Sequence, residues 1–208
     1  MSISSYSELK TAVENWLDRD DLSDRVEEFI SLAETRLYRR LMPRAFEERS
    51  YTPLVAGQEY YSLPTDFLYQ RNVQINTNPV NVLKYMTPEQ LDKEYPNTGS
   101  GVPAAYTIIG NEIQIKPIPS STDNLEIAYF QKLPALSATN TTNWTLTNAP
   151  DLLLYGSLIE AEAYLVNDPR IGIWKAAFDE GLQHVNALEM RARHSGNHLE
   201  MRTGTRNP

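Results

Sequence analysis

Apolar side chains recur every three to four residues in the first fifty residues, which is the spacing of an amphipathic helix. The first such face consists of Tyr6, Leu9, Val13 and Trp16. A capping box of Ser5 and Glu8 predicts where this helix begins. After a polar turn at residues 20–23, a second face consists of Val26, Ile30, Ala33, Leu37 and Leu41. Pro43 ends this second stripe, so we predict two helices in this part of the chain.

From about residue 51 the apolar spacing shortens to two, as in β-strands. Short strands are predicted over residues 58–63 and 71–75, where aromatic and β-branched residues alternate with polar ones. A short helix is expected to begin at Thr87, because Gln90 completes a second capping box there.

The clearest local prediction is a β-hairpin over residues 105–116. Its two-residue turn is Gly110–Asn111, a pair suited to the positive φ angles of tight hairpin turns. With Ile109 opposite Glu112, one face of the hairpin holds Tyr106, Ile108, Ile113 and Ile115. Register and hydrophobic pattern therefore agree. A third strand is predicted over residues 125–129.

A polar segment rich in Pro, Thr and Asn precedes an almost wholly apolar helix over residues 152–165. The charge of that helix is confined mainly to Glu160 and Glu162, which predicts burial on most sides. A final helix is expected after a cap at Asp168–Pro169, with the apolar stripe Trp174, Phe178, Gly181, Val185 and Leu188. A long polar segment before a helix of this kind favours an assembly subunit over a compact enzyme.

This order of elements predicts an α+β fold. We expect the N- and C-terminal helix pairs to form a four-helix bundle, with a β-rich insertion between them and an extended C-terminal tail. The predicted parts are the N-terminal helices (1–50), the insertion (51–135), the connector arm with the C-terminal helices (136–194), and the tail (195–208).

Composition is that of a soluble globular protein, with 208 residues, 41% hydrophobic and 22% charged. The length suits one domain with a sizeable core or two small ones. No apolar run reaches the roughly 18 residues that span a bilayer, and the N-terminus lacks the pattern of a signal peptide. We therefore expect neither secretion by a signal peptide nor a membrane anchor.

The formal net charge of −8 argues against a body that grips nucleic acid. The C-terminal end differs, because residues 190–208 carry Arg191, Arg193, Arg202 and Arg206 against Glu200 alone. An acidic body thus carries a basic tail, although a solvated terminus explains the same charges.

Catalytic patterns are missing from the sequence. There is no Gly-rich phosphate loop and no HExxH, DxDxDG or GxSxG motif. The chain has no cysteine, and its three histidines lie near the C-terminus, which argues against a zinc site. The acidic residues between Asp18 and Asp24 are explained by helix capping and solubility. We predict no enzyme, no catalytic residue, no metal and no cofactor.

Several segments together resemble the head–tail adaptor (connector) proteins of tailed bacteriophages. The matching segments are YYSLPTDFLYQRNVQ (60–74), TPEQLD (87–92), GVPAAYTIIGNEIQIKP (101–117) and the stretch 125–165, followed by a helix with Asp168, Arg170 and Trp174. None of them is a catalytic signature, so the resemblance rests on their order and spacing over nearly the whole chain.

The resemblance implies a structural protein that forms a ring, dodecameric in this family, between portal and tail. The expected partners are the portal protein, a tail or nozzle protein and further copies of the chain, with no membrane. Double-stranded DNA would pass through the ring without specific binding, which an acidic lining favours. The expected location is the head–tail junction of the virion, after assembly in the host cytoplasm.

Two sets of interaction residues follow from this reading. In related adaptors the C-terminal segment extends into the portal, which implies portal-binding roles for Arg191, Arg193, His194, His198, Arg202 and Arg206. The polar connector is expected to lie on a neighbouring subunit as an arm, with contacts from Leu136, Trp144 and Leu146.

Three alternatives stay open at this point. A tail-tube or nozzle subunit would assemble with tail proteins and never with portal. A small cytoplasmic enzyme would have a deep pocket with strongly perturbed carboxylates. A DNA-binding protein would bind tightly and in a salt-dependent way as a monomer.

Overall fold

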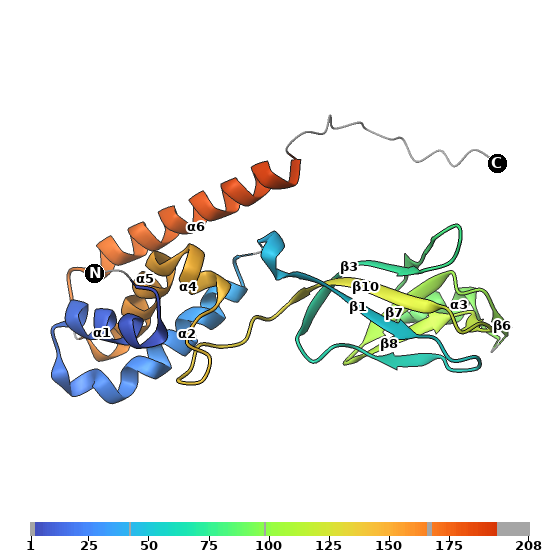
Figure 1. Cartoon of the computed structure of the whole chain (residues 1–208), viewed down its shortest axis with the longest axis horizontal. Helices are drawn as coiled ribbons and strands as arrows, with labels where there is room; N and C mark the ends of the chain where they lie inside the picture. Colours follow the sequence, from blue (N-terminus) through green and yellow to red (C-terminus); the bar gives the residue numbers. More distant parts are fainter. Residues whose placement is uncertain (1–2, 42, 98, 166–167, 195–208) are drawn as a thin grey trace. The chain divides into compact units, whose positions relative to one another are not determined.

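The computed structural model describes residues 3–41, 43–97, 99–165 and 168–194 (Figure 1). It divides into two compact units, which we call the helical unit (Met1–Arg44 with Leu133–Pro208) and the β unit (Ala45–Lys132). The fold is mixed α+β, as predicted.

The helical unit brings together segments from both ends of the chain. Its α-helices are α1 (Tyr6–Leu17), α2 (Val26–Tyr38), α4 (Trp144–Asn148), α5 (Pro150–Glu160) and α6 (Ile171–His194). Short 3-10 helices occur at Asp20–Arg25 and Ala161–Tyr164, and a third, Arg44–Phe46, leads into the β unit.

Helix α1 begins as predicted, because the Ser5 side chain accepts a hydrogen bond from the backbone N–H of Glu8. Its buried face is slightly different from the predicted one. Trp16 is 44% exposed, whereas Leu17 is buried. Leu17 follows Val13 by four residues and so continues the face that packs inward, while Trp16 turns toward the edge of that face.

The apolar stripe predicted for α2 is confirmed. Its five members, Val26, Ile30, Ala33, Leu37 and Leu41, are all buried. The predicted turn before it is the 3-10 helix Asp20–Arg25.

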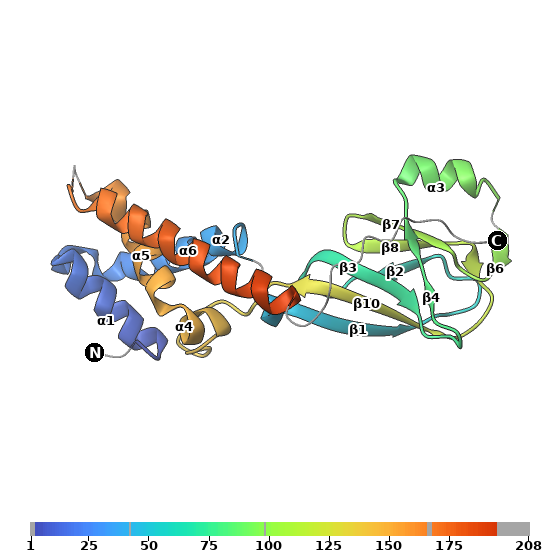
Figure 2. The same cartoon turned by 90° about the horizontal axis from the view of Figure 1, so that it is seen from above.

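Helix α5 occupies the centre of the helical unit. It packs against α1, α2, α4 and α6, and both views show α6 lying along it (Figure 2). Seven of its residues are buried, as expected for a helix covered on most sides: Leu152, Leu153, Leu154, Gly156, Ser157, Leu158 and Ile159. The α-helix ends at Glu160, earlier than predicted, and continues as a 3-10 turn.

Helix α6 is only partly covered. Trp174, Phe178 and Leu182 are buried, but Leu188, the last member of the predicted apolar stripe, is 62% exposed. The reason is length, because α5 spans 11 residues and α6 spans 24. The second half of α6 therefore extends beyond its partner helix.

The β unit consists of short strands and one helix. They are β1 (Glu47–Pro53), β2 (Tyr60–Ser62), β3 (Phe67–Ile75), β4 (Asn81–Val82), β5 (Lys84–Tyr85), α3 (Pro88–Glu94), β6 (Ser100–Gly101), β7 (Ala105–Ile109), β8 (Glu112–Lys116), β9 (Ile118–Pro119) and β10 (Asn124–Gln131). They form two four-stranded sheets, β1-β10-β3-β4 and β2-β8-β7-β5, and the pair β6-β9.

The predicted hairpin is confirmed in both position and register. Ile109 lies opposite Glu112, and Ile108 lies opposite Ile113. Gly110 has a φ of 61°, which the tight turn requires. The capping box at Thr87 and Gln90 is also present at the start of α3.

The larger part of the core of the β unit is an apolar cluster to which both sheets contribute, and a smaller cluster of Met86, Leu91 and Ala105 includes a residue of α3. The buried members of the larger cluster are Leu54, Tyr61, Leu63, Val73, Ile75, Leu83, Tyr106, Ile113, Ile115, Leu125, Ile127 and Tyr129. The predicted third strand is part of β10, and its three inward side chains all belong to this cluster.

Candidate interaction surfaces

The polar connector, residues 133–149, is attached to its own chain by a buried carboxylate on α2. Glu34 is 4% exposed and accepts hydrogen bonds from the backbone N–H of Leu136, 3.2 Å from each oxygen. The Asn143 side-chain amide donates to the same carboxylate at 2.8 Å. The backbone N–H of Tyr6 adds a bond to the carbonyl of Thr141 at 2.8 Å. The connector thus follows a defined path across α1 and α2.

The three residues predicted to contact a neighbouring subunit lie on this path. Leu136 and Leu146 are buried within their own chain, and Trp144 is partly buried. Asn143 caps α4 by accepting from the backbone N–H of Leu146 at 2.9 Å. A contact of this segment with a neighbour stays a prediction, and its exposed residues, such as Thr141 and Thr147, are the ones open to it.

Tyr38 also contacts the connector, and the charge of Glu34 affects its pKa. The Tyr38 hydroxyl donates to the carbonyl of Leu133 at 3.3 Å. Burial, followed by the negative charge of Glu34, raises the pKa of Tyr38 well above its usual range. The phenol therefore stays a neutral donor, which helps to hold the first residue of the connector.

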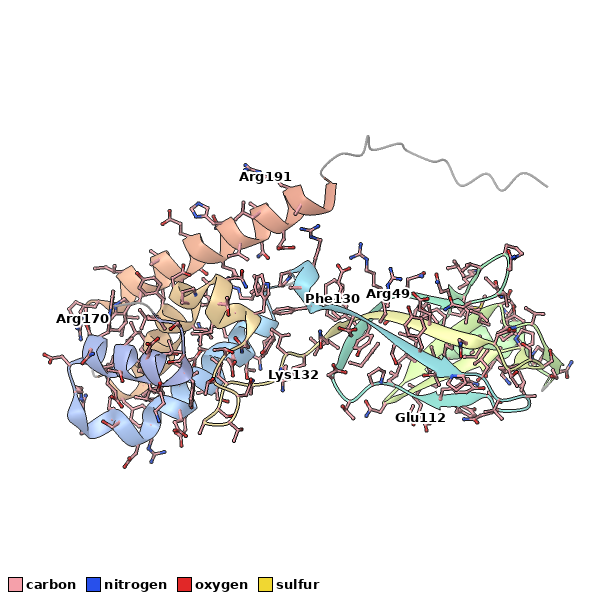
Figure 3. The ribbon with its side chains drawn as sticks, in the orientation of Figure 1. Arg49, Glu112, Phe130, Lys132, Arg170 and Arg191 are labelled. Carbon is pink, nitrogen blue, oxygen red and sulfur yellow. The ribbon has the colours of Figure 1, made fainter. Side chains whose placement is uncertain are left out.

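The residues predicted to bind the portal start at the end of α6. Arg191 is exposed, and its side chain points away from the helical unit (Figure 3). Arg193 and His194 belong to the last turn of α6, but their side chains lie outside the described part of the structure, as do His198, Arg202 and Arg206.

Contacts of two arginines, Arg170 and Arg44, hold the two ends of α6 against other parts of the helical unit. At the N-terminal end Arg170 pairs with Asp168 at 2.7 Å, donates to the carbonyl of Trp16 at 3.1 Å and lies over the Trp174 ring. Farther along, the backbone N–H of Arg44 donates to the Glu189 carboxylate at 2.9 Å. These contacts hold in place the end of α6 from which the basic tail continues.

A groove of about 400 Å³ lies along the C-terminal half of α2. Its lining residues are Leu32, Thr35, Arg36, Arg39, Arg40 and Glu160. We call it the arginine groove. Arg36 is paired with Glu160 at 2.6 Å, and Arg40 with Asp179 at 3.0 Å. Leu32 is 50% exposed within it, so an apolar side chain lies beside a cluster of cations.

The β unit has a cleft of about 450 Å³ beside α3, lined by Lys84, Met86, Gln90, Lys93 and Glu94.

An ion pair in the same unit involves a buried lysine of β8. The ammonium group of Lys116 lies 2.8 Å from the Glu59 carboxylate, which also accepts a hydrogen bond from Gln114. Burial alone would raise the pKa of Glu59, but these bonds outweigh it and the pKa is lowered. We therefore assign the Glu59–Lys116 ion pair to the stability of the β unit.

The described residues contain no group of three His, Asp or Glu side chains placed to hold a metal ion. Among the helices that the structure describes, none combines the length and apolar character that crossing a bilayer requires.

Sequence reasoning missed both Glu34 and the arginine groove. Glu34 lies between two members of the apolar stripe of α2, Ala33 and Leu37, and a carboxylate on that inward side was a signal of a buried acceptor. The groove had a weaker signal in the arginines that follow Thr35, because cations near the C-terminal end of a helix are also favoured by the helix dipole alone.

Comparison with known proteins identifies a family for this chain. No curated protein matches the chain. The family model described as SU10 adaptor protein matches residues 4–202, which is nearly the whole sequence and includes both units. The chain therefore belongs to the SU10 adaptor protein family, which confirms the resemblance to phage adaptors.

Proposed function

We propose that this protein is a head–tail adaptor that forms a ring, dodecameric by the resemblance, below the portal. The ring joins the capsid to the tail and continues the channel for DNA. The observation that carries the proposal is the family match over residues 4–202. Membership in a family of structural adaptors also argues against an enzyme.

The parts of the chain have separate roles in this proposal. The helices of residues 1–50 and 136–194 act as a four-helix bundle in the ring wall, and the packing of α1, α2 and α6 on α5 supports this. The insertion, residues 51–135, faces the next tail component. The connector arm contacts a neighbouring subunit, with Trp144 and the exposed side chains beside it as the contacting residues.

The C-terminal tail, residues 195–208, binds the portal in this proposal. Arg191, Arg193, His194, His198, Arg202 and Arg206 face an acidic groove on the portal and order the tail on binding. The exposed position of Arg191 at the end of α6 supports this role. The net negative charge of the whole chain suits a channel that DNA crosses without sticking.

Light scattering of the purified protein, alone and after mixing with the cognate portal ring, tests the proposal. We expect a portal complex with about one adaptor copy per portal subunit, because each copy would use one portal site. Failure to associate at any salt concentration would contradict it, and association with tail proteins alone would favour a tail-tube or nozzle subunit.

Deletion of residues 195–208 tests the role of the tail. The shortened protein is expected to keep its circular dichroism spectrum and thermal unfolding and to lose portal binding. Normal attachment of the shortened protein to the portal would overturn the assignment of the tail.

A further inference from the structure

The two ends of α2 have opposite charge. Residues 14–28, which lead into the helix and form its first turn, contain seven acidic residues and two arginines. Residues 36–44, at its other end, contain four arginines and no acidic residue. We call the first of these segments the acidic edge. The helix itself spans 13 residues, so the two charge clusters are roughly 20 Å apart.

The arginine groove has the composition of a protein interface. Exposed Leu32 supplies apolar contact area, and three arginines surround it. Arg36 and Arg40 are engaged within the chain, but the exposed guanidinium of Arg39 has no hydrogen-bond or ion-pair partner among the described residues. Arginine beside an apolar side chain is a frequent centre of binding energy. Within the part of the chain that the structure describes, Arg39 is therefore available to an anionic partner.

The acidic edge has the complementary property. Its arginines are used locally, since Arg19 pairs with Asp21 and Arg25 pairs with Glu28. Asp24 is exposed and forms no salt bridge with the residues that the structure describes. The edge keeps an excess of negative charge after these pairs are formed.

We propose that the acidic edge of one subunit docks into the arginine groove of the next copy, with Asp24 close to Arg39. The inference rests on the proposed ring, which needs two different surfaces on each subunit. Opposite ends of one helix provide such surfaces, and both belong to the same compact unit. Every copy then offers an edge to one neighbour and a groove to the other.

A second copy fits the groove better than a nucleic-acid phosphate. Exposed Leu32 in the groove can pack against apolar surface of another protein and gains nothing from a phosphate. The edge of a neighbouring chain brings carboxylates together with apolar surface from the exposed Trp16 region. The contact is expected to weaken with added salt, because its charges lie near solvent.

Thiol crosslinking tests the contact, since the chain has no cysteine of its own. The double variant Ser23→Cys/Thr35→Cys places one thiol in the edge and one in the groove without changing a charge. Portal-bound protein treated with a short bismaleimide is expected to give a ladder of covalent multimers. Protein carrying only one of the two cysteines serves as the control and is expected to stay uncrosslinked.

The pattern of crosslinked products distinguishes the head-to-tail contact from other arrangements. Products that stop at dimers would indicate a two-fold pair and overturn the head-to-tail contact. Full portal loading without crosslinks would overturn the contact and leave the ring intact. If unmodified protein does not load the portal, the proposed function fails, and crosslinking of the free protein at high concentration decides the contact: a ladder supports it and its absence overturns it.

Charge reversal provides the second measurement. Arg39→Glu and Asp24→Lys are each expected to raise the concentration for half-loading of the portal roughly tenfold, because like charges then face each other. An equimolar mixture of the two variants is expected to load normally, since alternating subunits restore opposite charges at every contact. Lys93→Glu and Glu89→Lys, on exposed positions of α3, are the matched controls. Reversal variants that load like these controls would overturn the proposal.

Discussion

Two buried carboxylates, Glu34 and Glu126, and one partly buried carboxylate, Glu59, are each stabilised by a different kind of donor. Glu34 accepts from a backbone N–H and a side-chain amide. Glu59 faces the buried ammonium of Lys116. Glu126, on β10, pairs with Arg49 at 3.3 Å. Because a buried charge without partners is costly, each carboxylate favours the native arrangement, in which its donors are in place.

Replacement of Glu34 by alanine is expected to lower the free energy of unfolding by roughly 2 to 3 kcal/mol, because it leaves buried donors of the connector unpaired. Urea unfolding measures this loss, and hydrogen exchange at the Leu136 amide is expected to speed up. Glu28→Ala, at an exposed position of the same helix, is the control and is expected to cost less than about 1 kcal/mol. Equal losses for the two variants would show that Glu34 does not hold the connector.

Glu59→Gln is expected to make the free energy of unfolding less dependent on pH in the acid range. The folded protein lowers the pKa of Glu59, so its contribution is fully present above the unfolded pKa of about 4.3 and is lost as pH falls through the folded value. At pH 7 the variant leaves Lys116 without its counter-charge, at a cost of roughly 2 to 3 kcal/mol after allowance for partial exposure. Urea unfolding at pH 7 and pH 3 is expected to show that the difference from wild type shrinks in acid. A constant difference would contradict this role.

At the scale of elements, α5 determines how the helical unit packs. Gly156 allows close approach of its neighbours, because a Cβ at this position would lie 3.0 Å from the Ala33 Cβ and 3.3 Å from the Phe178 ring. Residues from α2, α5 and α6 thus meet at one point of the core. Interiors of this density do not tolerate an added methyl group without a shift of the surrounding chain.

Gly156→Ala is accordingly expected to lower the free energy of unfolding by about 1 to 3 kcal/mol through overpacking. Gly172→Ala is the matched control, since its added Cβ meets nothing within 4 Å. That control is expected to stabilise α6 by roughly 0.5 to 1 kcal/mol, because alanine favours a helix more than glycine does. Thermal unfolding of both variants measures the contrast. Similar melting temperatures would mean that the helices separate easily at Gly156.

At the scale of the whole molecule, the β unit is an insertion with its own core. Its first and last strands are paired, so that Glu47 lies opposite Phe130 and the two chain ends of the unit lie together. The apolar cluster of the unit is formed by residues from within it. Adjacent ends and a separate core are typical of an inserted domain.

A fragment of residues 45–132 is therefore expected to fold alone. Circular dichroism is expected to show a β-rich spectrum, and denaturant unfolding is expected to be cooperative. Tyr129→Phe within the fragment is expected to lower its stability only slightly, because it removes one partly buried hydrogen bond, from the Tyr129 hydroxyl to Asp66 at 3.0 Å. A fragment that stays unfolded would show that the core needs the helical unit.

The sequence by itself determined the features whose hydrogen bonds and contacts are local. The caps at Ser5 and Thr87, the buried stripe of α2 and the hairpin at Gly110 all depend on residues within a few positions of one another. The α+β class followed from the order of such elements along the chain, and the family resemblance followed from the order and spacing of the matching sequence segments.

Tertiary structure decided what depends on distant partners. Strand β1 is rich in charged residues and was missed, because it becomes a strand through its pairing with β10. The exposure of Leu188 depends on where α5 ends, and the path of the connector depends on Glu34, about 100 positions away in the sequence. The arginine groove likewise depends on distant segments, because α5 supplies Glu160 to its lining and α6 supplies Asp179, which pairs with Arg40. Local propensity cannot encode such partners, since they are chosen by packing between segments that are far apart in the chain.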